Sequence, residues 1–136
     1  MSNVETQVTG AFGENIVIAE FLKRNLDIYL PVVDRGVDCI VRSSTGNYYE
    51  VQIKTRATTK RGKHIFEVRG FRVRDNFFIV CYQSKLEPDA FWILPSKVFK
   101  EYGSPRPKYG SHRLNLTPKK QKILVEYKNN FKQLMK

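Results

Sequence analysis

Two neighbouring segments decide the fold: DRGVDCIVR at residues 34–42 and YYEVQIKTR at residues 48–56. Both segments are rich in β-branched and aromatic residues, which favour strands. The five residues between them, SSTGN at residues 43–47, are small and polar and contain Gly46, which is typical of a hairpin turn. If the hairpin is centred near Thr45, residues whose numbers sum to about 90 lie opposite each other, so Asp38 faces Gln52. The sequence therefore predicts an antiparallel hairpin.

Alternation along the second strand gathers polar side chains on one face. Glu50, Gln52 and Lys54 project to the same side, and the apolar residues between them project to the other. Opposite side chains on one face lie about 5 Å apart, close enough for Asp38 and Gln52 to share one metal ion. Lys54 stands one step further along that face. The hairpin thus collects a carboxylate, a second oxygen ligand and an ammonium group.

This set of groups suits phosphodiester hydrolysis. A metal ion can activate water and neutralise charge on the scissile phosphate. Hard oxygen ligands favour Mg²⁺, which keeps several waters and takes one or two protein side chains. An ammonium group beside the metal can position the attacking water and stabilise the phosphate in the transition state. Spacing alone leaves an alternative open, in which Glu50, Gln52 and Lys54 are only the solvated face of a strand.

The rest of the chain predicts an α/β fold, with a mixed sheet flanked by helices in a single domain over residues 1–136. Apolar residues recur at helical spacing over 4–24, where Gly10 and Gly13 call for a packing role or a bend. Glu14 falls at the edge of that apolar stripe, from which it can reach the sheet. Further strands are expected at 28–33, 64–68, 77–82 and 90–94. A short helix is expected from Ser96 to Gly103, a loop over 103–110, and a helix from 117 to the C-terminus.

Composition excludes several classes of protein. Of 136 residues, 41% are hydrophobic and 12% aromatic, enough to bury a core. The longest apolar or aromatic run, at 77–82, is far too short to span a membrane, and the first residues do not form a secretory signal. The two cysteines, Cys39 and Cys81, lie in apolar runs and indicate buried thiols in a reducing compartment. Secreted, membrane-spanning and disulfide-stabilised classes are excluded.

The charge indicates a polyanionic partner. Lys and Arg number 24 against 13 acidic residues, a formal net charge of +11. Residues 1–22 carry three glutamates and no basic residue, whereas residues 54–74 carry eight basic residues against one acid. From Lys97 onward, eleven basic residues stand against two acids. Two basic blocks after an acidic segment fit a nucleic-acid groove, although a solvated face that aids solubility is the alternative. The phosphate-contacting candidates are Arg56, Lys60, Arg61, Lys63, Arg72 and Arg74.

Three motifs together resemble a known superfamily. Gly13-Glu14 in the first helix, Gly36-Val37-Asp38 and Glu50-Val51-Gln52-Ile53-Lys54-Thr55-Arg56 are similar to those of the PD-(D/E)XK nucleases. That superfamily includes restriction endonucleases, archaeal Holliday junction resolvases and an intron-associated homing endonuclease branch. The resemblance implies a restriction-endonuclease-like core. Here Val37 replaces the proline that names the motif, and Gln52 replaces an acid.

The same resemblance implies roles for four residues. Asp38 is the motif aspartate, Gln52 fills the acidic position, Lys54 is the motif lysine, and Glu14 is the acid that the helix supplies. Asp38, Gln52 and Glu14 would hold Mg²⁺, with Mn²⁺ able to substitute, and Lys54 would orient the hydrolytic water. Asp34 is interpreted as a turn residue, and Glu50 as structural or a reserve ligand.

The prediction for function is a metal-dependent DNA endonuclease, either site-specific in the manner of homing enzymes or junction-resolving. The alternative is a non-catalytic module that binds nucleic acid on the same fold. One short domain covers little duplex, so a homodimer or larger homo-oligomer is expected. The expected location is the cytoplasm, in association with the nucleoid.

Overall fold

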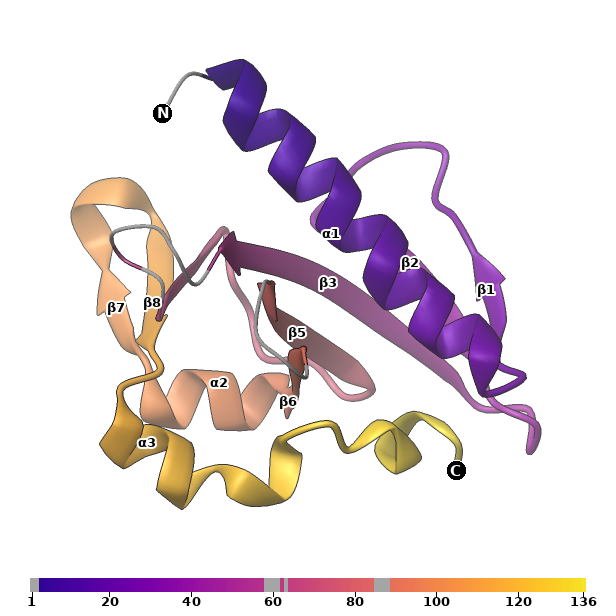
Figure 1. Ribbon diagram of the computed structural model, residues 1–136. Helices are drawn as coiled ribbons and strands as arrows, with labels where there is room; N and C mark the ends of the chain where they lie inside the picture. The colour runs from indigo at the N-terminus through magenta and orange to yellow at the C-terminus, as the bar shows by residue number, and fades with distance from the viewer. Residues whose placement is uncertain (1–2, 58–61, 63, 85–88) are drawn as a thin grey trace.

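The structure, a computed structural model, describes residues 3–57, 62, 64–84 and 89–136, with side chains from residue 7 onward. Its centre is a five-stranded sheet in the order β1-β2-β3-β5-β6 (Figure 1). The strands are β1 (Asp27–Tyr29), β2 (Cys39–Arg42), β3 (Tyr48–Ala57), β5 (Phe77–Ser84) and β6 (Ala90–Pro95). Only β3 and β5 run parallel. The sheet is therefore mixed, as predicted.

A second, three-stranded antiparallel sheet has the order β4-β8-β7. It consists of β4 (Ile65–Arg69), β8 (Ser111–Asn115) and β7 (Ser104–Arg106). The sequence indicated only β4. The stretch 103–110, expected to be a loop, contains β7 and the 3₁₀ helix η1 (Pro107–Tyr109), and β8 follows it. Proline and glycine at this place gave the segment the composition of a loop, but pairing with β8 and β4 holds it as a sheet.

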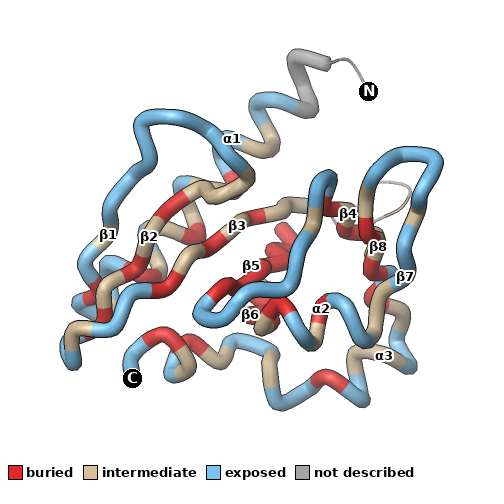
Figure 2. The backbone as a smooth tube through the Cα atoms, turned by 180° about the vertical axis from the view of Figure 1, so that it is seen from behind, coloured by how far each residue is buried: buried red, intermediate tan, exposed pale blue. Residues whose placement is uncertain are grey.

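The two faces of the large sheet are covered differently. The helix α1 (Asn3–Lys23) packs on one face, where Val17 and Phe21 are fully buried against Val51 and Ile53 of β3. The other face is covered by α2 (Ser96–Tyr102) and the three-stranded sheet, which supply Phe99 and other buried apolar residues. Buried residues therefore lie on both faces of the large sheet (Figure 2). Because β5 and β6 are covered on both faces, their residues are buried almost throughout.

A close approach fixes α1 on the sheet. A Cβ atom at Gly13 would overlap the side chain of Thr55 in β3, so only glycine permits this contact. The Thr55 hydroxyl is buried there and has no hydrogen-bond partner among the described residues. Gly13 therefore has the packing role that the sequence indicated.

The C-terminal segment differs from the expected long helix. Thr117 caps α3 (Pro118–Ile123) by accepting a hydrogen bond from the Lys120 N–H at 3.4 Å. The helix ends at Ile123, and two 3₁₀ helices follow, η2 (Val125–Tyr127) and η3 (Phe131–Leu134). Asn129 exchanges two hydrogen bonds with Phe91 at the edge of β6, of 2.6 and 2.9 Å. Those bonds require the chain to leave the helix. The first expected strand is also shorter, since β1 ends at Tyr29.

Both cysteines are fully buried, as predicted, and burial raises the pKa of the Cys39 thiol to about 12. Within the described residues, no helix is both long enough and apolar enough to cross a bilayer.

Candidate active site

The candidate site lies where β2 stops and β3 continues. Cys39 pairs with Val51, so the predicted register, in which residue numbers sum to 90, is correct. The Asp38 N–H donates to the Val51 carbonyl at 2.8 Å, and the Asp38 Oδ2 accepts from the Ile53 N–H at 2.6 Å. The Asp38 side chain thus makes the last hydrogen bond between this segment and β3, in the place of a backbone carbonyl. Beyond it, the rest of β3 pairs with β5 on its other side. Among the described residues, no strand pairs there with the edge of β3 that faces β2, so this end of β3 is open on that side.

Three of the sequence-predicted residues lie at this open end. Cys39 and Val51 belong to the core under α1, so by alternation Gln52 and Lys54 project to the opposite face of β3. Asp38, directly before β2, places its carboxylate at the edge of β3. All three are partly buried. Glu50 lies on the same face, but its Oε1 accepts a hydrogen bond from Arg74 Nη2 at 3.1 Å. Its charge is therefore compensated outside the site.

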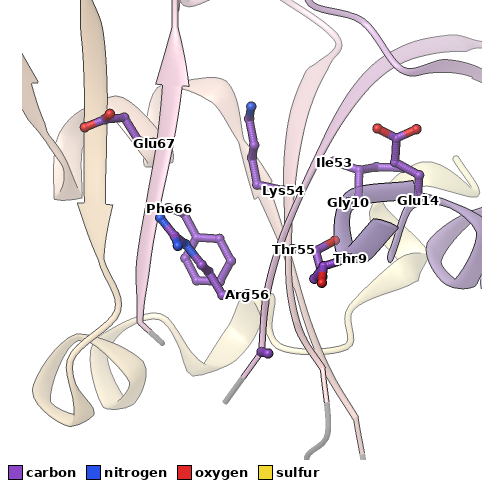
Figure 3. A pocket seen from close by; sticks show the side chains of 10 residues that line it. Thr9, Gly10, Glu14, Ile53, Lys54, Thr55, Arg56, Phe66 and Glu67 are labelled. Atoms are coloured by element: carbon purple, nitrogen blue, oxygen red, sulfur yellow. The ribbon is translucent and has the colours of Figure 1, made fainter. Parts of the chain in front are cut away.

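Glu14 comes from α1, on the other side of the sheet. The contact of Gly13 with Thr55 sets α1 at the open end of β3, and Glu14 then lines a cavity there together with Lys54 (Figure 3). The cavity has a volume of about 410 Å³. It is lined by Thr9, Gly10, Glu14, Ile53, Lys54, Thr55, Arg56, Ala57, Phe66 and Glu67. Five consecutive residues of β3 take part, so side chains from both faces of the strand meet at this edge.

The ionised forms of the Glu14 and Asp38 carboxyl groups are disfavoured in this site, and a bound cation would stabilise them. Burial raises the pKa of the Glu14 carboxyl, and the negative charges of Asp38 and Asp34 raise it further, while Lys54 opposes them. Burial also raises the pKa of the Asp38 carboxyl, against the lowering effects of the Ile53 N–H and of Lys54. The carboxylates around Lys54 thus exceed what one ammonium group can compensate.

Asp34 lies in the turn before Gly36, as the sequence indicated. Its Oδ1 accepts a hydrogen bond from the Gly36 N–H at 3.0 Å, and Gly36 has a φ of +83°. Because its charge raises the pKa of both Glu14 and Asp38, this turn residue also contributes to the field of the site.

These groups fit a divalent ion of the Mg²⁺ type. In the part of the chain that the structure describes, no three His, Cys, Asp or Glu side chains converge closely enough to enclose a metal. Mg²⁺ does not need such a cage, because it retains water and takes one or two carboxylates. Asp38 and Glu14, whose ionised forms are disfavoured here, together with the Gln52 amide oxygen are hard donors that a cation would stabilise.

The residues predicted to contact phosphates fall into three groups. Arg56 is exposed at the cavity, where its Nε donates to the Ile65 carbonyl at 2.8 Å. Arg72 is exposed. Arg74 pairs with Glu50, and its guanidinium lies 4.1 Å from the centre of the Phe77 ring. The remaining three, Lys60, Arg61 and Lys63, lie outside the described residues.

Sequence reasoning missed the wall of the cavity that β4 forms. Phe66 and Glu67 line it, opposite α1. The one signal for Glu67 was that it is the single acid within the basic block 54–74.

Comparison with solved structures identifies the architecture. The chain is similar to the structure of a bacterial homing endonuclease, I-Ssp6803I, with a TM-score of 0.65 and 22% sequence identity over 96% of this chain and 93% of that chain. The chain has the restriction-endonuclease-like fold. The predicted α/β fold, with a mixed sheet flanked by helices, is thereby confirmed. No protein-family model matches the sequence, and no curated protein matches it either.

Proposed function

We propose that this protein is a Mg²⁺-dependent DNA endonuclease. The observation that carries the proposal is the meeting of Glu14, Asp38 and Lys54 at the open end of β3, with Gln52 on the same strand face as Lys54. These groups come from three elements of a fold that a homing endonuclease shares. Since the similar protein is a homing endonuclease, site-specific cleavage of duplex DNA is the favoured activity and junction cleavage the second.

Each residue has a role in this mechanism. Asp38, Gln52 and Glu14 would hold the ion, which when bound supplies a Lewis acid for the phosphate and lowers the pKa of water. The Lys54 ammonium donates hydrogen bonds to the attacking water and to a phosphate oxygen, and so fixes the direction of attack. The Ile53 N–H holds the Asp38 carboxylate in one orientation, which leaves Oδ1 for the ion. Arg56 at the rim of the cavity positions the DNA backbone.

The test is incubation of the purified protein with supercoiled plasmid, a short duplex and a four-way junction. Each substrate is treated with Mg²⁺, with Mn²⁺ and with a chelator. We expect cleavage with either ion and none with the chelator. Binding without any cleavage under all conditions would instead support the alternative, a non-catalytic DNA-binding module, and would refute the endonuclease.

Binding itself is tested by salt. If at least about four Lys or Arg side chains contact phosphates, log affinity falls with log salt concentration at a slope near −0.9 per contact. A nearly flat response in a duplex titration would refute DNA as the partner. A DNA substrate would also place the protein at the nucleoid.

We further propose that two copies pair through α1. Between residues 7 and 22, every exposed residue of this helix is uncharged, although the chain carries a net charge of +11. The exposed stripe consists of Val8, Phe12, Asn15, Ala19 and Leu22, with alternating spacings of four and three residues, as in a helix that pairs with another. In an antiparallel pair, Phe12 of one copy lies against Ala19 of the other, and the opposed helix dipoles attract. A dimer would present two cavities to the two strands of a duplex.

Substitution of one residue tests the pairing. Phe12→Glu should convert the dimer to a monomer in sedimentation, because Phe12 is 58% exposed and its loss leaves the core intact. Ile123→Glu is the matched control, since Ile123 is 50% exposed on α3, and it should leave the dimer unchanged. A wild-type chain that is monomeric at high concentration would contradict the pairing.

A further inference from the structure

The three-stranded sheet has one apolar face and one polar face. Phe66, Val68 and Leu114 point inward and are buried in the core that covers β5 and β6. By alternation the other residues of these strands form the outer face, and all are at least partly exposed. The outer face consists of Ile65, Glu67 and Arg69 of β4, Ser111, Arg113 and Asn115 of β8, and Ser104 and Arg106 of β7.

Register brings three arginines of the outer face together around one acid. Arg69 and Arg106 both pair with Ser111, and Glu67 pairs with Arg113. Glu67 Oε1 accepts a hydrogen bond from Arg113 Nε at 2.9 Å and lies 3.5 Å from Arg106 Nη1. One carboxylate therefore orients two guanidinium groups, and a net positive charge remains.

Each of the two arginines is oriented by Glu67, and Arg106 has a second contact. Its guanidinium lies 4.5 Å from the centre of the Tyr109 ring. The bond from Arg113 to Glu67 uses Nε, the donor nearest the aliphatic stem, so Glu67 does not engage the two Nη groups at its tip. Arginines ordered in this way lose little conformational entropy when they bind.

The outer face is continuous with the candidate active site. Glu67 lines the same cavity as Lys54 and Glu14. In Figure 3, Glu67 on β4 and Lys54 on β3 both line that cavity, and Glu14 lies beyond Lys54. A duplex whose backbone lay at Lys54 would extend across the outer face.

Oriented arginines suit base edges more than phosphates. A β-ribbon fits the major groove, where the guanidinium fork donates two hydrogen bonds to the O6 and N7 atoms of guanine. Phosphate contacts, by contrast, need only charge, and the carboxylate of Glu67 reduces the attraction of its two arginines for phosphates. Asn115 adds an exposed, short hydrogen-bonding side chain to the same face.

We propose that the outer face of the three-stranded sheet reads base edges in the major groove of duplex DNA, with Arg69, Arg106 and Arg113 as the specificity-determining residues. The inference rests on the proposed function, which makes DNA the partner. It adds the surface of the protein that recognises the DNA sequence. Glu67 acts as a positioning residue, through Arg106 and Arg113.

The test is selection of bound duplexes from a randomised library in the presence of a chelator, so that binding is measured without cleavage. The wild-type protein should enrich a sequence motif containing guanines. Arg69→Ala should lose the preference at one position of the motif by about tenfold or more. Arg113→Lys should do the same at another position, since it keeps the charge and loses the fork. Both variants should bind unselected DNA within a few-fold of the wild-type protein.

Arg72→Ala is the matched control, an exposed arginine outside the outer face. It should weaken binding to all sequences equally and leave the motif unchanged. Arg69 is exposed at the end of β4, so its variant is expected to fold even where a change at Arg113 disturbs the sheet.

The outcomes separate the two proposals. A wild-type protein that cleaves DNA but enriches no motif would overturn the inference and leave the proposed function standing. Selective binding without cleavage, lost in Arg69→Ala and Arg113→Lys, would support the inference and refute the endonuclease. An unchanged motif in both variants would overturn the inference.

Discussion

Two polar clusters meet at the same cavity, and their compositions are opposite. At the open end of β3, the charges of Asp34 and Asp38 act on Glu14, and Lys54 is the ammonium group that opposes them. On the outer face of the three-stranded sheet, Glu67 pairs with Arg106 and Arg113, and Arg69 lies on the same face. In each cluster one charge of the minority sign offsets only part of the majority charge. The first cluster therefore attracts a cation and the second an anion.

The clusters also differ in burial. Burial is the largest cause of the raised pKa of both Glu14 and Asp38. On the outer face Arg69 and Asn115 are exposed, and Arg106 and Arg113 are partly buried. Electrostatic interactions strengthen where water is excluded, which favours bond cleavage, while recognition of a long partner requires an accessible surface. The difference fits the two proposals, in which the acidic cluster at β3 cleaves the DNA and the outer face of the three-stranded sheet recognises it.

The largest expected effect comes from removing one acid of the first cluster. Asp38→Ala should lower the initial rate of DNA cleavage at least about 100-fold, since it deletes a proposed metal ligand. Duplex affinity should remain, because the basic surface is untouched. The measurements are cleavage rate and a binding titration, with circular dichroism to verify the fold. Asp75→Ala, at an exposed acid away from the cavity, is the control and should cleave at the parental rate. Parental activity in Asp38→Ala would remove the site assignment.

A second prediction breaks the packing that brings the acids together. Gly13→Ala should destabilise the protein by about 1–3 kcal/mol, because the added methyl group overlaps Thr55 and must push α1, and with it Glu14, off β3. Gly10→Ala, three residues away, has open space around the new atom and should stabilise the helix by up to about 1 kcal/mol. Urea denaturation of both variants measures the difference. Equal effects of the two substitutions would contradict the close contact.

The acidic cluster could be predicted in part because its determinants are local. Alternation places Gln52 and Lys54 on one face, and a short turn fixes the register that brings Asp38 opposite Gln52. Apart from the family resemblance, Glu14 was indicated only by its place at the edge of an apolar stripe. Its actual position depends on the contact between Gly13 and Thr55, which are distant in sequence, so no local pattern could fix it.

The basic cluster could not be predicted from local patterns. Its strands β4 and β8 pair residues that are more than forty positions apart in the sequence, such as Glu67 and Arg113. Pro105 and Gly110 give β7 and the turn after it the composition of a loop. The predicted length of the C-terminal helix was wrong for a similar reason, because it depends on contacts between residues that are distant in sequence. Its start at Thr117 follows from a local cap, but its end depends on the bonds of Asn129 with β6.

The third prediction sharpens the comparison by adding charge to the acidic cluster. Gln52→Glu places another carboxylate beside the proposed ion and should lower the Mg²⁺ concentration for half-maximal cleavage by about tenfold. Its maximal rate should fall, because the new carboxylate also attracts Lys54. Gln52→Ala should raise the metal requirement. The measurement is a Mg²⁺ titration of the initial rate for all three proteins. Superimposable curves would mean that Gln52 is not a ligand and that Glu14 or Glu50 takes its place.

The smallest effect concerns the stability of the protein without metal. Burial raises the pKa of Asp38 above its usual 3.8, so ionisation of this carboxyl destabilises the folded state. The penalty is absent below pH 3.8, develops as pH rises through the raised pKa, and is fully present at neutral pH. Asp38→Asn removes the charge and keeps an oxygen that can accept the hydrogen bond from the Ile53 N–H. In chelator at pH 7, the variant should therefore melt a few degrees above the wild-type protein, and the difference should vanish below pH 3.8. Excess Mg²⁺ should reverse the order at pH 7, because only the wild-type carboxylate gains from the ion. Thermal melts across pH with and without Mg²⁺ measure both effects. A variant that melts below the wild-type protein by the same amount at every pH would show that the Asp38 carboxylate serves the fold rather than a cation.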